Sequence, residues 1–464
     1  MTTAVPQPSV QTDAPAAERA PLAWLTLEVA LYTLIVLAAA ALRWGDAGHY
    51  PLSNVEARQA LVAQAIYQGD DLPAGSYSPL LASLNTLTFI LLNDSDTTAR
   101  LASVLLGVLL VLLPATLRRQ LGQKSCLLVA GLLALSPSAI FLARTNTGET
   151  ATALGALMMV SGFFNWAKDG RQRWLLLLAG GLAVLLTSGP LAFTVLVVFG
   201  VMVALRWSAF KTMAPAGRSQ WRSAGIFLAA LLLALGTAAS LNLSGFGVTT
   251  GLFTDWLSRF SFTPRPDAGF NAVFLLTIYE PLLVVAGLVG LAYALLGRDL
   301  LRQSFVGWFV GVLLLDLGMA GRPAGSLLLA VVPLAFLGGE ALAELWRGLE
   351  RQGSWGNEGV ILAAGLVITV FGYIGLTGWL VRHCDEGNTF CQLAWLQPVV
   401  ALLLFLVIVT FFAYIARPDA ALRGLALTGT AIGVLFALSI GWRLSHGPLE
   451  RLGFQPLAGV PPST

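Results

Sequence analysis

Charged side chains are scarce in this sequence. Asp, Glu, Lys and Arg make up 11% of the 464 residues, whereas the apolar and aromatic types AVILMFWYC make up 56%, and the mean hydropathy is +0.77. Soluble domains carry roughly 25% charged residues, so most of this chain is expected to face lipid. The length allows on the order of a dozen spans of about 20 residues each. We therefore predict an all-α polytopic membrane protein.

Other residue types and motifs are also lacking, and each absence excludes a class of function. Three cysteines and three histidines are too few for a Cys/His zinc site or a haem chain. The net charge of +3, without a long basic run, does not indicate a partner that is a nucleic acid. There is no Walker loop and no GxGxxG after a strand, which argues against a nucleotide-driven pump. The first twenty residues lack the features of a cleaved signal peptide, so the first span is expected to stay attached.

Apolar runs between charged residues predict thirteen transmembrane helices. Their approximate ranges are 22–42, 99–117, 125–143, 150–167, 174–188, 190–206, 224–242, 271–296, 304–319, 325–345, 358–380, 397–416 and 424–441.

The distribution of basic residues predicts the orientation of these spans. With the N-terminus in the cytoplasm, the inner segments hold 17 of the 27 basic residues, including all three lysines. Because cytoplasmic loops carry the excess of Lys and Arg, we expect a multi-pass protein of the plasma membrane with a cytoplasmic N-terminus and an extracytoplasmic C-terminus. The predicted organisation is a disordered cytoplasmic tail (1–21), a membrane core (22–345) with an extracytoplasmic loop (43–98), C-terminal transmembrane helices (346–441) and a short extracytoplasmic tail (442–464).

Two of the cysteines share a predicted outer loop. An oxidising exterior would let Cys384 and Cys391 form a disulfide, the alternative being a pair of reduced thiols close together by coincidence. Cys126 lies at the start of an apolar span and is expected to pack there.

The longest polar stretch, residues 43–98, is predicted to lie outside. Residues 54–67 combine helix-forming residues, an N-cap candidate at Asn54 and apolar positions at helical spacing, which is typical of a helix in the membrane interface. The apolar stretch 80–92 is short for a span. Because a crossing there would place the basic loops outside, we interpret it as a second interfacial helix.

Several charged residues fall on the same predicted membrane face. Glu56 and Arg58 begin the first interfacial helix, Glu149 follows the third span, and Arg322 occupies a Gly-Arg-Pro turn. They could be separate solvated charges, or they could converge on one cavity. Within the membrane, Glu280 and Asp316 lie in apolar surroundings. A carboxylate there usually faces a cavity or a partner, and a structural bond to a hydroxyl or to Arg322 is the alternative to a functional role.

The order of these motifs resembles the GT-C glycosyltransferases, and more narrowly family 39, which includes protein O-mannosyltransferases and lipid A aminoarabinose transferases. The resemblance covers residues 22–345. It rests on short motifs in a shared order: Val55-Glu56-Ala57-Arg58, Tyr77-Ser78-Pro79, Thr98-Ala99-Arg100-Leu101, Leu135-Ser136-Pro137 ahead of Arg144 and Glu149, and Gly321-Arg322-Pro323 leading to Val332-Pro333. It implies a GT-C-like bundle of about 13 transmembrane helices with interfacial helices in the first outer loop.

Members of this family move a sugar from a polyprenyl-phosphate donor to an acceptor outside the cell, which can be a lipid, a glycan or a protein. A carboxylate accepts the proton of the acceptor, and arginines bind the phosphate. The resemblance implies catalytic roles for Glu56 and Glu149, and donor binding by Arg58, Arg322 and Tyr77. No metal or other cofactor is implied as essential.

One position departs from the family pattern. The first acid of its Asp-Glu pair, which most often serves as the base, is Val55 here. Three hypotheses therefore stay open: an active transferase, a catalytically silent relative that serves as a subunit of a membrane complex or glycan pathway, and a transporter or flippase. A transporter would predict inverted repeats or paired broken helices, and the sequence has no clear repeat.

Overall fold

The chain is described here from a computed structural model, which covers residues 26–48, 50–73, 75–212, 218–243, 245–260, 272–297, 299–319, 325–350, 356–381, 396–415 and 418–446. Every regular element in these ranges is a helix. The first eleven are α1 (Leu27–Trp44), α2 (Asn54–Gln68), α3 (Pro79–Leu92), α4 (Asp96–Leu112), η1 (Leu113–Leu117), α5 (Arg118–Leu121), α6 (Gln123–Leu135), α7 (Pro137–Ala143), α8 (Glu149–Asp169), α9 (Gln172–Ser188) and α10 (Ala192–Leu205). They are followed by α11 (Trp207–Thr212), α12 (Arg218–Gly236), α13 (Gly245–Ser258), α14 (Ala272–Tyr279), α15 (Pro281–Leu296), α16 (Leu300–Gly318), α17 (Ser326–Glu350), α18 (Gly356–Val381), α20 (Leu396–Ile415) and α21 (Pro418–His446).

Every predicted span overlaps one or two of these helices, which confirms the all-helical membrane class. Within the described ranges, six helices are long and apolar enough to cross a membrane, or eight if each of two bent helix pairs counts as one span. Five shorter apolar helices accompany them, so thirteen crossings stay a prediction. Two details of the sequence prediction are wrong. The helix predicted over 224–242 ends at Gly236, because residues 238–240 have positive φ angles, and part of the predicted loop after it forms the helix α13.

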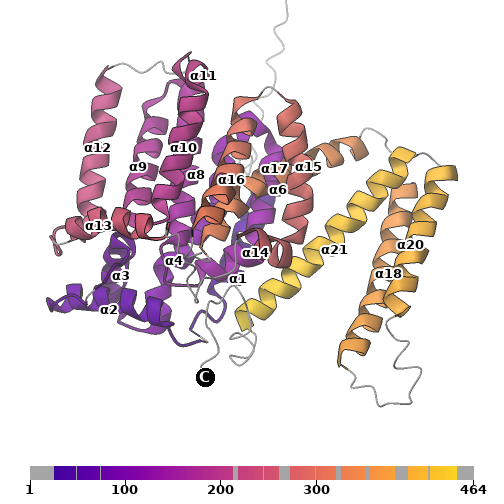
Figure 1. The fold of residues 1–464 in the computed structure, drawn as a ribbon, viewed down its shortest axis with the longest axis horizontal. Helices are drawn as coiled ribbons and strands as arrows, with labels where there is room; N and C mark the ends of the chain where they lie inside the picture. The colour runs from indigo at the N-terminus through magenta and orange to yellow at the C-terminus, as the bar shows by residue number, and fades with distance from the viewer. Residues whose placement is uncertain are drawn as a thin grey trace, which may run out of the picture.

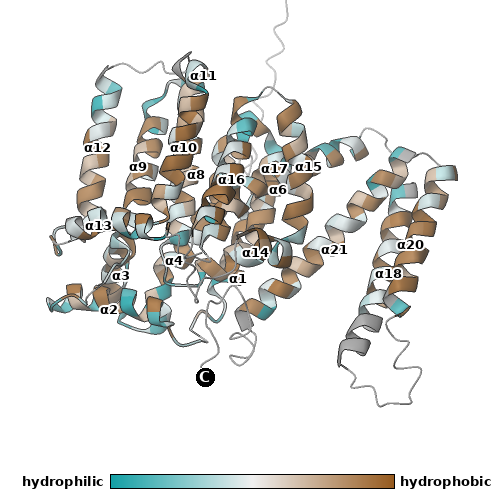
Figure 2. Ribbon diagram, viewed as in Figure 1, coloured by the Kyte–Doolittle hydropathy of each residue, from teal (hydrophilic) through white to brown (hydrophobic). Residues whose placement is uncertain are grey.

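The helices form one long bundle with a separate group at its end (Figure 1). The helix α17 lies in the core of the bundle, where it packs against α15, α16, α6 and α8, and 83% of its most apolar segment is buried, against 11% for α1. The C-terminal helices α18, α20 and α21 pack on one another, and α21 leans across to contact α7 and α15. Figure 2 shows hydrophobic residues along most of the length of the upright helices, with hydrophilic residues gathered on α2 and near helix ends.

Two spans are broken inside the bundle, and one carboxylate links the breaks. The pair α6/α7 bends by 62° at Ser136-Pro137, and the pair α14/α15 bends by 112° at Glu280-Pro281. At each break a single residue separates the two helices, and the proline after it is the first residue of the second helix. A proline is tolerated at this position because the first N–H groups of a helix have no partner within the helix. The Oε1 of Glu280 accepts hydrogen bonds from the Ser136 hydroxyl at 2.5 Å and from the Ser138 N–H at 2.9 Å. Glu280 therefore satisfies donors that the break in the neighbouring span leaves open.

Two other buried charged residues bind open backbone groups at ends of these helices, Arg43 at the end of α6 and Asp316 at the start of α14. Arg43 is fully buried at the end of α1, and its guanidinium donates to the carbonyls of Leu133 and Ala134 at the end of α6. Asp316 has the same kind of role near the end of α16, where it accepts from the Ala272 N–H at 2.8 Å and from the Ser326 hydroxyl at 2.5 Å. The structural alternative for Glu280 and Asp316, a bond to a hydroxyl, is thus what the structure shows.

The first outer segment folds as two helices in the predicted places. The cap of α2 is Ser53 rather than Asn54: the Ser53 hydroxyl accepts from the Glu56 N–H while the Glu56 carboxylate accepts from the Ser53 N–H, a reciprocal capping box. Asn54 is instead the first residue of the helix. The 14 residues of α3 extend about 21 Å at 1.5 Å per residue, which is short for a hydrocarbon core of about 30 Å. Placement of α2 and α3 in the interface stays a prediction.

Segments that were predicted to face the cytoplasm meet at one end of the bundle. Ion pairs join Arg118 to Glu28, Arg119 to Asp169, and Lys124 to Glu350. These pairs bring together the start of α1, the segment before α6, the end of α8 and the end of α17. The grouping of the loops therefore agrees with the predicted topology, whereas the side of the membrane on which this end lies stays a prediction.

Candidate functional site

A cavity of about 270 Å³ lies at the other end of the bundle. It is lined by residues from the start of α2, the loop before α3, the start of α8, the break between α9 and α10, and the end of α13: Val55, Arg58, Gln59, Ser76, Tyr77, Ser78, Asn146, Thr147, Gly148, Glu149, Thr152, Ser188, Gly189, Pro190, Leu191, Leu252 and Arg259. The sequence predictions Arg58, Tyr77 and Glu149 are in this set. The cavity thus combines charged and hydroxyl groups that come from five segments of the chain.

Glu149 is the acid that faces this cavity. It is the first residue of α8, where the unpaired N–H groups and the helix dipole favour a negative charge. Its Oε2 is buried and has no hydrogen-bond partner among the described residues. The preceding Gly148 lies so close to the end of α9 that an added Cβ would stand 1.9 Å from the Ser188 carbonyl oxygen. The close approach of α8 and α9 fixes Glu149 at the cavity wall, where no described residue bonds to its Oε2.

Glu56 lies behind the cavity rather than on its wall. The residue is 4% exposed, and its two oxygens accept four hydrogen bonds: from Arg100 Nε (2.8 Å), Arg100 Nη2 (3.1 Å), the Asn146 N–H (2.9 Å) and the Ser53 N–H (3.0 Å). Arg100 in turn donates to the carbonyls of Ala47 and Tyr50, both at 2.8 Å. Glu56 therefore joins α2, α4 and the loop before α8, as expected for a residue on a different flank of α2 from Arg58.

The hydrogen bonds to Glu56 lower the pKa of its carboxyl group. Burial raises the pKa of the carboxyl, but the hydrogen bonds and charge of Arg100, with those from Ser53 and Asn146, outweigh burial and hold the pKa of Glu56 below its ordinary value. A carboxyl whose folded pKa is depressed stabilises the fold at every pH above its unfolded pKa of about 4.3 and loses this contribution as the pH falls through the folded pKa.

We expect the melting temperature of the purified protein to decrease as the pH is lowered below about 4.3. The Glu56→Gln variant should lose this part of the pH dependence. Thermal melts by circular dichroism between pH 3 and pH 7 measure it. Parallel curves for wild type and variant would contradict the assignment.

Val55 and Arg58 place α2 at the cavity. Val55 is 66% exposed, so the position where the family pattern has an acid does face the cavity. The Arg58 guanidinium passes beside Gly75, where Nη1 would lie 3.1 Å from an added Cβ. Because Gly75 has φ +118°, a conformation that residues with a side chain rarely adopt, its backbone favours a glycine at this position.

Neutral hydrogen bonds hold the loop that carries Tyr77. The Gln59 side chain clamps Ser78 by donating to its carbonyl at 3.0 Å and accepting from its N–H at 2.8 Å. The Tyr77 hydroxyl accepts from Asn242 Nδ2 at 2.9 Å, which ties the loop to the segment after α12. The ring of Tyr77 is 6% exposed, so it forms a fixed wall of the cavity.

Arg259 is a lining residue that the sequence reasoning counted only among the outer arginines. It follows α13, a short helix held by Trp256, whose indole N–H donates to the Thr194 hydroxyl at 2.9 Å. Phe193, Phe253 and Phe260 pack around the same indole. This aromatic cluster in 253–260 was the available signal for an ordered element in the predicted loop.

The remaining predicted residues divide into two groups. Arg322, Cys384 and Cys391 lie outside the described ranges, although Gly325, three residues after Arg322, is in direct contact with Glu149. Glu280 and Asp316 do not line this cavity and bond to their own neighbours. Cys126 is buried and free, as predicted. Within the residues covered, no group of three or more His, Cys, Asp or Glu side chains converges in a way that could hold a metal ion.

Comparison with known proteins finds similarity to glycosyltransferases in part of the sequence and in the fold. Residues 76–241 match the family described as dolichyl-phosphate-mannose-protein mannosyltransferase. This segment includes Tyr77, Arg100 and Glu149. No curated protein sequence matches the chain.

Solved structures share the fold at low sequence identity. ArnT from Cupriavidus metallidurans, solved with undecaprenyl phosphate, is 16% identical with a TM-score of 0.56, over 94% of this chain and 79% of ArnT. AglB, an oligosaccharyltransferase from Archaeoglobus fulgidus solved with an inhibitory peptide and a dolichol-phosphate, is 12% identical with a TM-score of 0.51, over 87% of this chain and 56% of AglB. The arabinosyltransferase EmbB from Mycobacterium smegmatis is 13% identical with a TM-score of 0.50, over 93% of this chain and 42% of EmbB.

These matches confirm the resemblance that the sequence motifs predicted. The chain covers much of ArnT but only about half of AglB and less than half of EmbB. The protein is a multi-pass membrane protein with the GT-C glycosyltransferase fold, and its residues 76–241 match the protein mannosyltransferase family.

Proposed function

We propose that this protein transfers a sugar from a polyprenyl-phosphate donor to an acceptor on the extracytoplasmic side of the plasma membrane. The observation that carries the proposal is Glu149, a carboxylate in a cavity that also holds Arg58 and Arg259, with one oxygen that makes no hydrogen bond to any described residue. An acid beside guanidinium groups suits a reaction that removes a proton from the acceptor and releases a phosphate. ArnT was solved with undecaprenyl phosphate and AglB with a dolichol-phosphate, and both ligands support this class of donor.

In the proposed reaction, a hydroxyl or amine of the acceptor attacks the anomeric carbon of the sugar. The bond between that carbon and the phosphate oxygen breaks, the acceptor's proton passes to Glu149, and the polyprenyl phosphate leaves with its electron pair. Arg58 stabilises the charge that develops on the phosphate, and the Tyr77 loop, which also lines the cavity, assists. Donor binding by Arg322 is proposed from the family resemblance alone. Glu56, whose oxygens already accept four hydrogen bonds, is a positioning residue that holds Arg100 and Asn146 rather than the base.

The proposed orientation puts the cavity outside. The opposite end of the bundle carries Arg118, Arg119 and Lys124 with their acidic partners, and an excess of basic residues marks the cytoplasmic side. Cysteine substitutions at Asp71 and at Arg171 probe the two ends. Reaction of intact cells with a membrane-impermeant maleimide should label only the former.

A turnover assay tests the function. The purified protein, reconstituted in liposomes, is supplied with polyprenyl-phosphate sugars and candidate lipid, glycan or peptide acceptors, and release of polyprenyl phosphate is measured by mass spectrometry. Release that depends on both donor and protein supports the proposal. If the donors bind but no release occurs with any acceptor, the protein is better described as a catalytically silent relative, the second hypothesis that Val55 favours.

The Val55→Asp variant separates these two hypotheses. Because Val55 is exposed and lines the cavity, aspartate fits there at little cost to stability. An enzyme with a weakened site is expected to gain turnover, since the new carboxylate supplies a second proton acceptor or a cation ligand. The matched control is Val55→Asn, because asparagine has nearly the same shape as aspartate but carries no charge. Equal activity of wild type, Val55→Asp and Val55→Asn would assign position 55 no part in the chemistry.

A further inference from the structure

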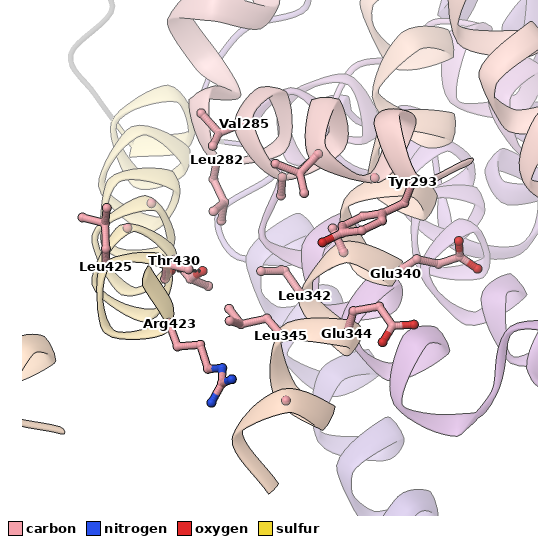
Figure 3. A pocket seen from close by; sticks show the side chains of 18 of the residues that line it. Leu282, Val285, Tyr293, Glu340, Leu342, Glu344, Leu345, Arg423, Leu425 and Thr430 are labelled. Carbon is pink, nitrogen blue, oxygen red and sulfur yellow. Dashed lines mark hydrogen bonds between the residues drawn. The ribbon is translucent and has the colours of Figure 1, made fainter. Parts of the chain in front are cut away.

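A second and larger cavity lies far from the candidate site. It has a volume of about 990 Å³ and runs between α15, α17 and α21. Its walls are apolar over most of their length, with Leu282, Val285, Leu342, Leu345, Leu425 and Phe436 among them (Figure 3). Such a volume is at the upper end of the range of about 300–1,000 Å³ for ligand pockets. Val285 and Leu425 are 66% and 38% exposed, so the groove opens on the surface that faces the membrane.

The polar groups of this groove gather at one end. Arg302, Glu340, Glu344, Arg347 and Arg423 all line it. Two of the arginines are in ion pairs: Arg302 pairs with Glu340 at 3.0 Å and with Asp299 at 3.5 Å, and Arg347 pairs with Glu344 at 2.8 Å. Arg423 is in no ion pair with a described residue.

Arg423 has the features of a ligand-binding cation. It is partly buried on α21 and its side chain passes over Gly348, where an added Cβ would stand 3.6 Å from Nε. Its Nη1 is a buried donor, and across the described residues it makes no hydrogen bond or ion pair. A buried donor without a partner costs free energy, so an anion bound beside it would stabilise both this side chain and the contact between α21 and α17.

The charged end of the groove is at the opposite face of the membrane from the candidate site. Glu149 contacts Gly325, which directly precedes α17, whereas Arg347 lies 22 residues farther along. At 1.5 Å per residue the helix covers about 33 Å between them, close to the thickness of about 30 Å of the hydrocarbon core. An amphiphile in this groove therefore comes from the other leaflet than one that reaches Glu149.

We infer that this groove binds one phosphate-bearing phospholipid of the leaflet opposite the candidate site, with its anionic headgroup on Arg423 and an acyl chain between α15, α17 and α21. The apolar walls match the chain, Arg423, whose Nη1 has no partner among the described residues, matches the headgroup, and basic pockets between transmembrane helices are known binding places for anionic lipids. The lipid would fill the space between the bundle and the C-terminal helix α21. The inference does not depend on the proposed transferase activity.

Native mass spectrometry of the full-length protein in mild detergent tests the inference. The probes are dioleoyl phosphatidylglycerol, which is anionic, and dioleoyl phosphatidylcholine, which has no net charge. We expect one molecule of the anionic lipid to bind more tightly than the zwitterionic lipid. Arg423→Gln should weaken the binding of phosphatidylglycerol about tenfold, as the loss of a charged hydrogen bond does. Arg443→Gln, the matched control at the other end of the same helix, should leave it unchanged.

A second variant blocks the chain rather than the headgroup. Gly429 lines the groove and has open space around it, so Gly429→Leu fills the groove without a clash and improves the helix propensity of α21. It should remove the bound lipid while the melting temperature in detergent stays at or above that of the wild type. Equal binding of the two lipids, unchanged binding by Arg423→Gln, full binding by Gly429→Leu, or complete displacement of the lipid by inorganic phosphate would each overturn the inference.

Discussion

Replacement of Glu149 by glutamine should lower kcat for sugar transfer by about 100- to 10,000-fold, the usual contribution of a positioned general base. Glutamine has nearly the same shape but cannot take the acceptor's proton. Because Glu149 sits at the first turn of α8 and its Oε2 makes no hydrogen bond within the described ranges, its loss should not disturb the fold. Donor binding should therefore persist while turnover is lost. The measurement is the release of polyprenyl phosphate under saturating donor and acceptor.

Asp71→Asn is the matched control for this prediction. Asp71 is an exposed acid in the segment between α2 and α3 and does not line the cavity, so its neutralisation should leave kcat unchanged. If Glu149→Gln retains wild-type turnover, Glu149 has no part in proton transfer. The same assay on Glu56→Gln then shows whether that residue is the base, provided that the variant is still folded.

Removal of Arg100 should have the largest effect on stability. Arg100→Met leaves Glu56 as a buried carboxylate without its counter-ion, and breaking a buried pair in this way typically costs about 3–5 kcal/mol. The side chains of both residues are almost fully buried, at 6% and 5% exposure, and Arg100 also holds the carbonyls of Ala47 and Tyr50. The variant should show a lower melting temperature and a lower free energy of unfolding in detergent.

Two controls test the mechanism of this loss. Arg119→Met breaks an ion pair with Asp169 in which the arginine is 58% exposed, so its effect should stay within about 1 kcal/mol. In the double variant Arg100→Met/Glu56→Gln the stranded charge is gone, and part of the stability should return. A double variant that is as unstable as the sum of the two single variants would show that the charge pair itself is not the cause.

The fold was predictable from the sequence to the extent that hydropathy specifies it. Apolar runs located the helices because each must bury or expose a continuous apolar surface to lipid. They did not reveal the breaks at Ser136-Pro137 and Glu280-Pro281, since a bent helix pair has the same hydropathy as a straight span. Nor did they reveal α13, whose order depends on the contact of Trp256 with Thr194, 62 positions earlier.

The candidate site was predictable in its residue types and less so in their roles. The resemblance to the GT-C family brought Arg58, Tyr77 and Glu149 into view, and all three line one cavity. The resemblance could not tell which of Glu56 and Glu149 acts as the base, because both are acids near the same predicted membrane face. The difference comes from tertiary neighbours: Arg100 and Asn146 occupy the oxygens of Glu56, while Oε2 of Glu149 makes no bond to any residue in the described part of the chain.

The bond between Glu280 and Ser136 has a consequence for biosynthesis. The two residues are 144 positions apart, so Ser136 and the open start of α7 enter the membrane long before the ribosome has made their acceptor. The core helix α17 is synthesised later still. A nascent chain that has reached residue 241, the end of the segment matched by the mannosyltransferase family, still lacks Glu280 and the helix α17. We therefore expect that segment, cut out and expressed alone, to be retained by the quality-control machinery of the membrane and degraded.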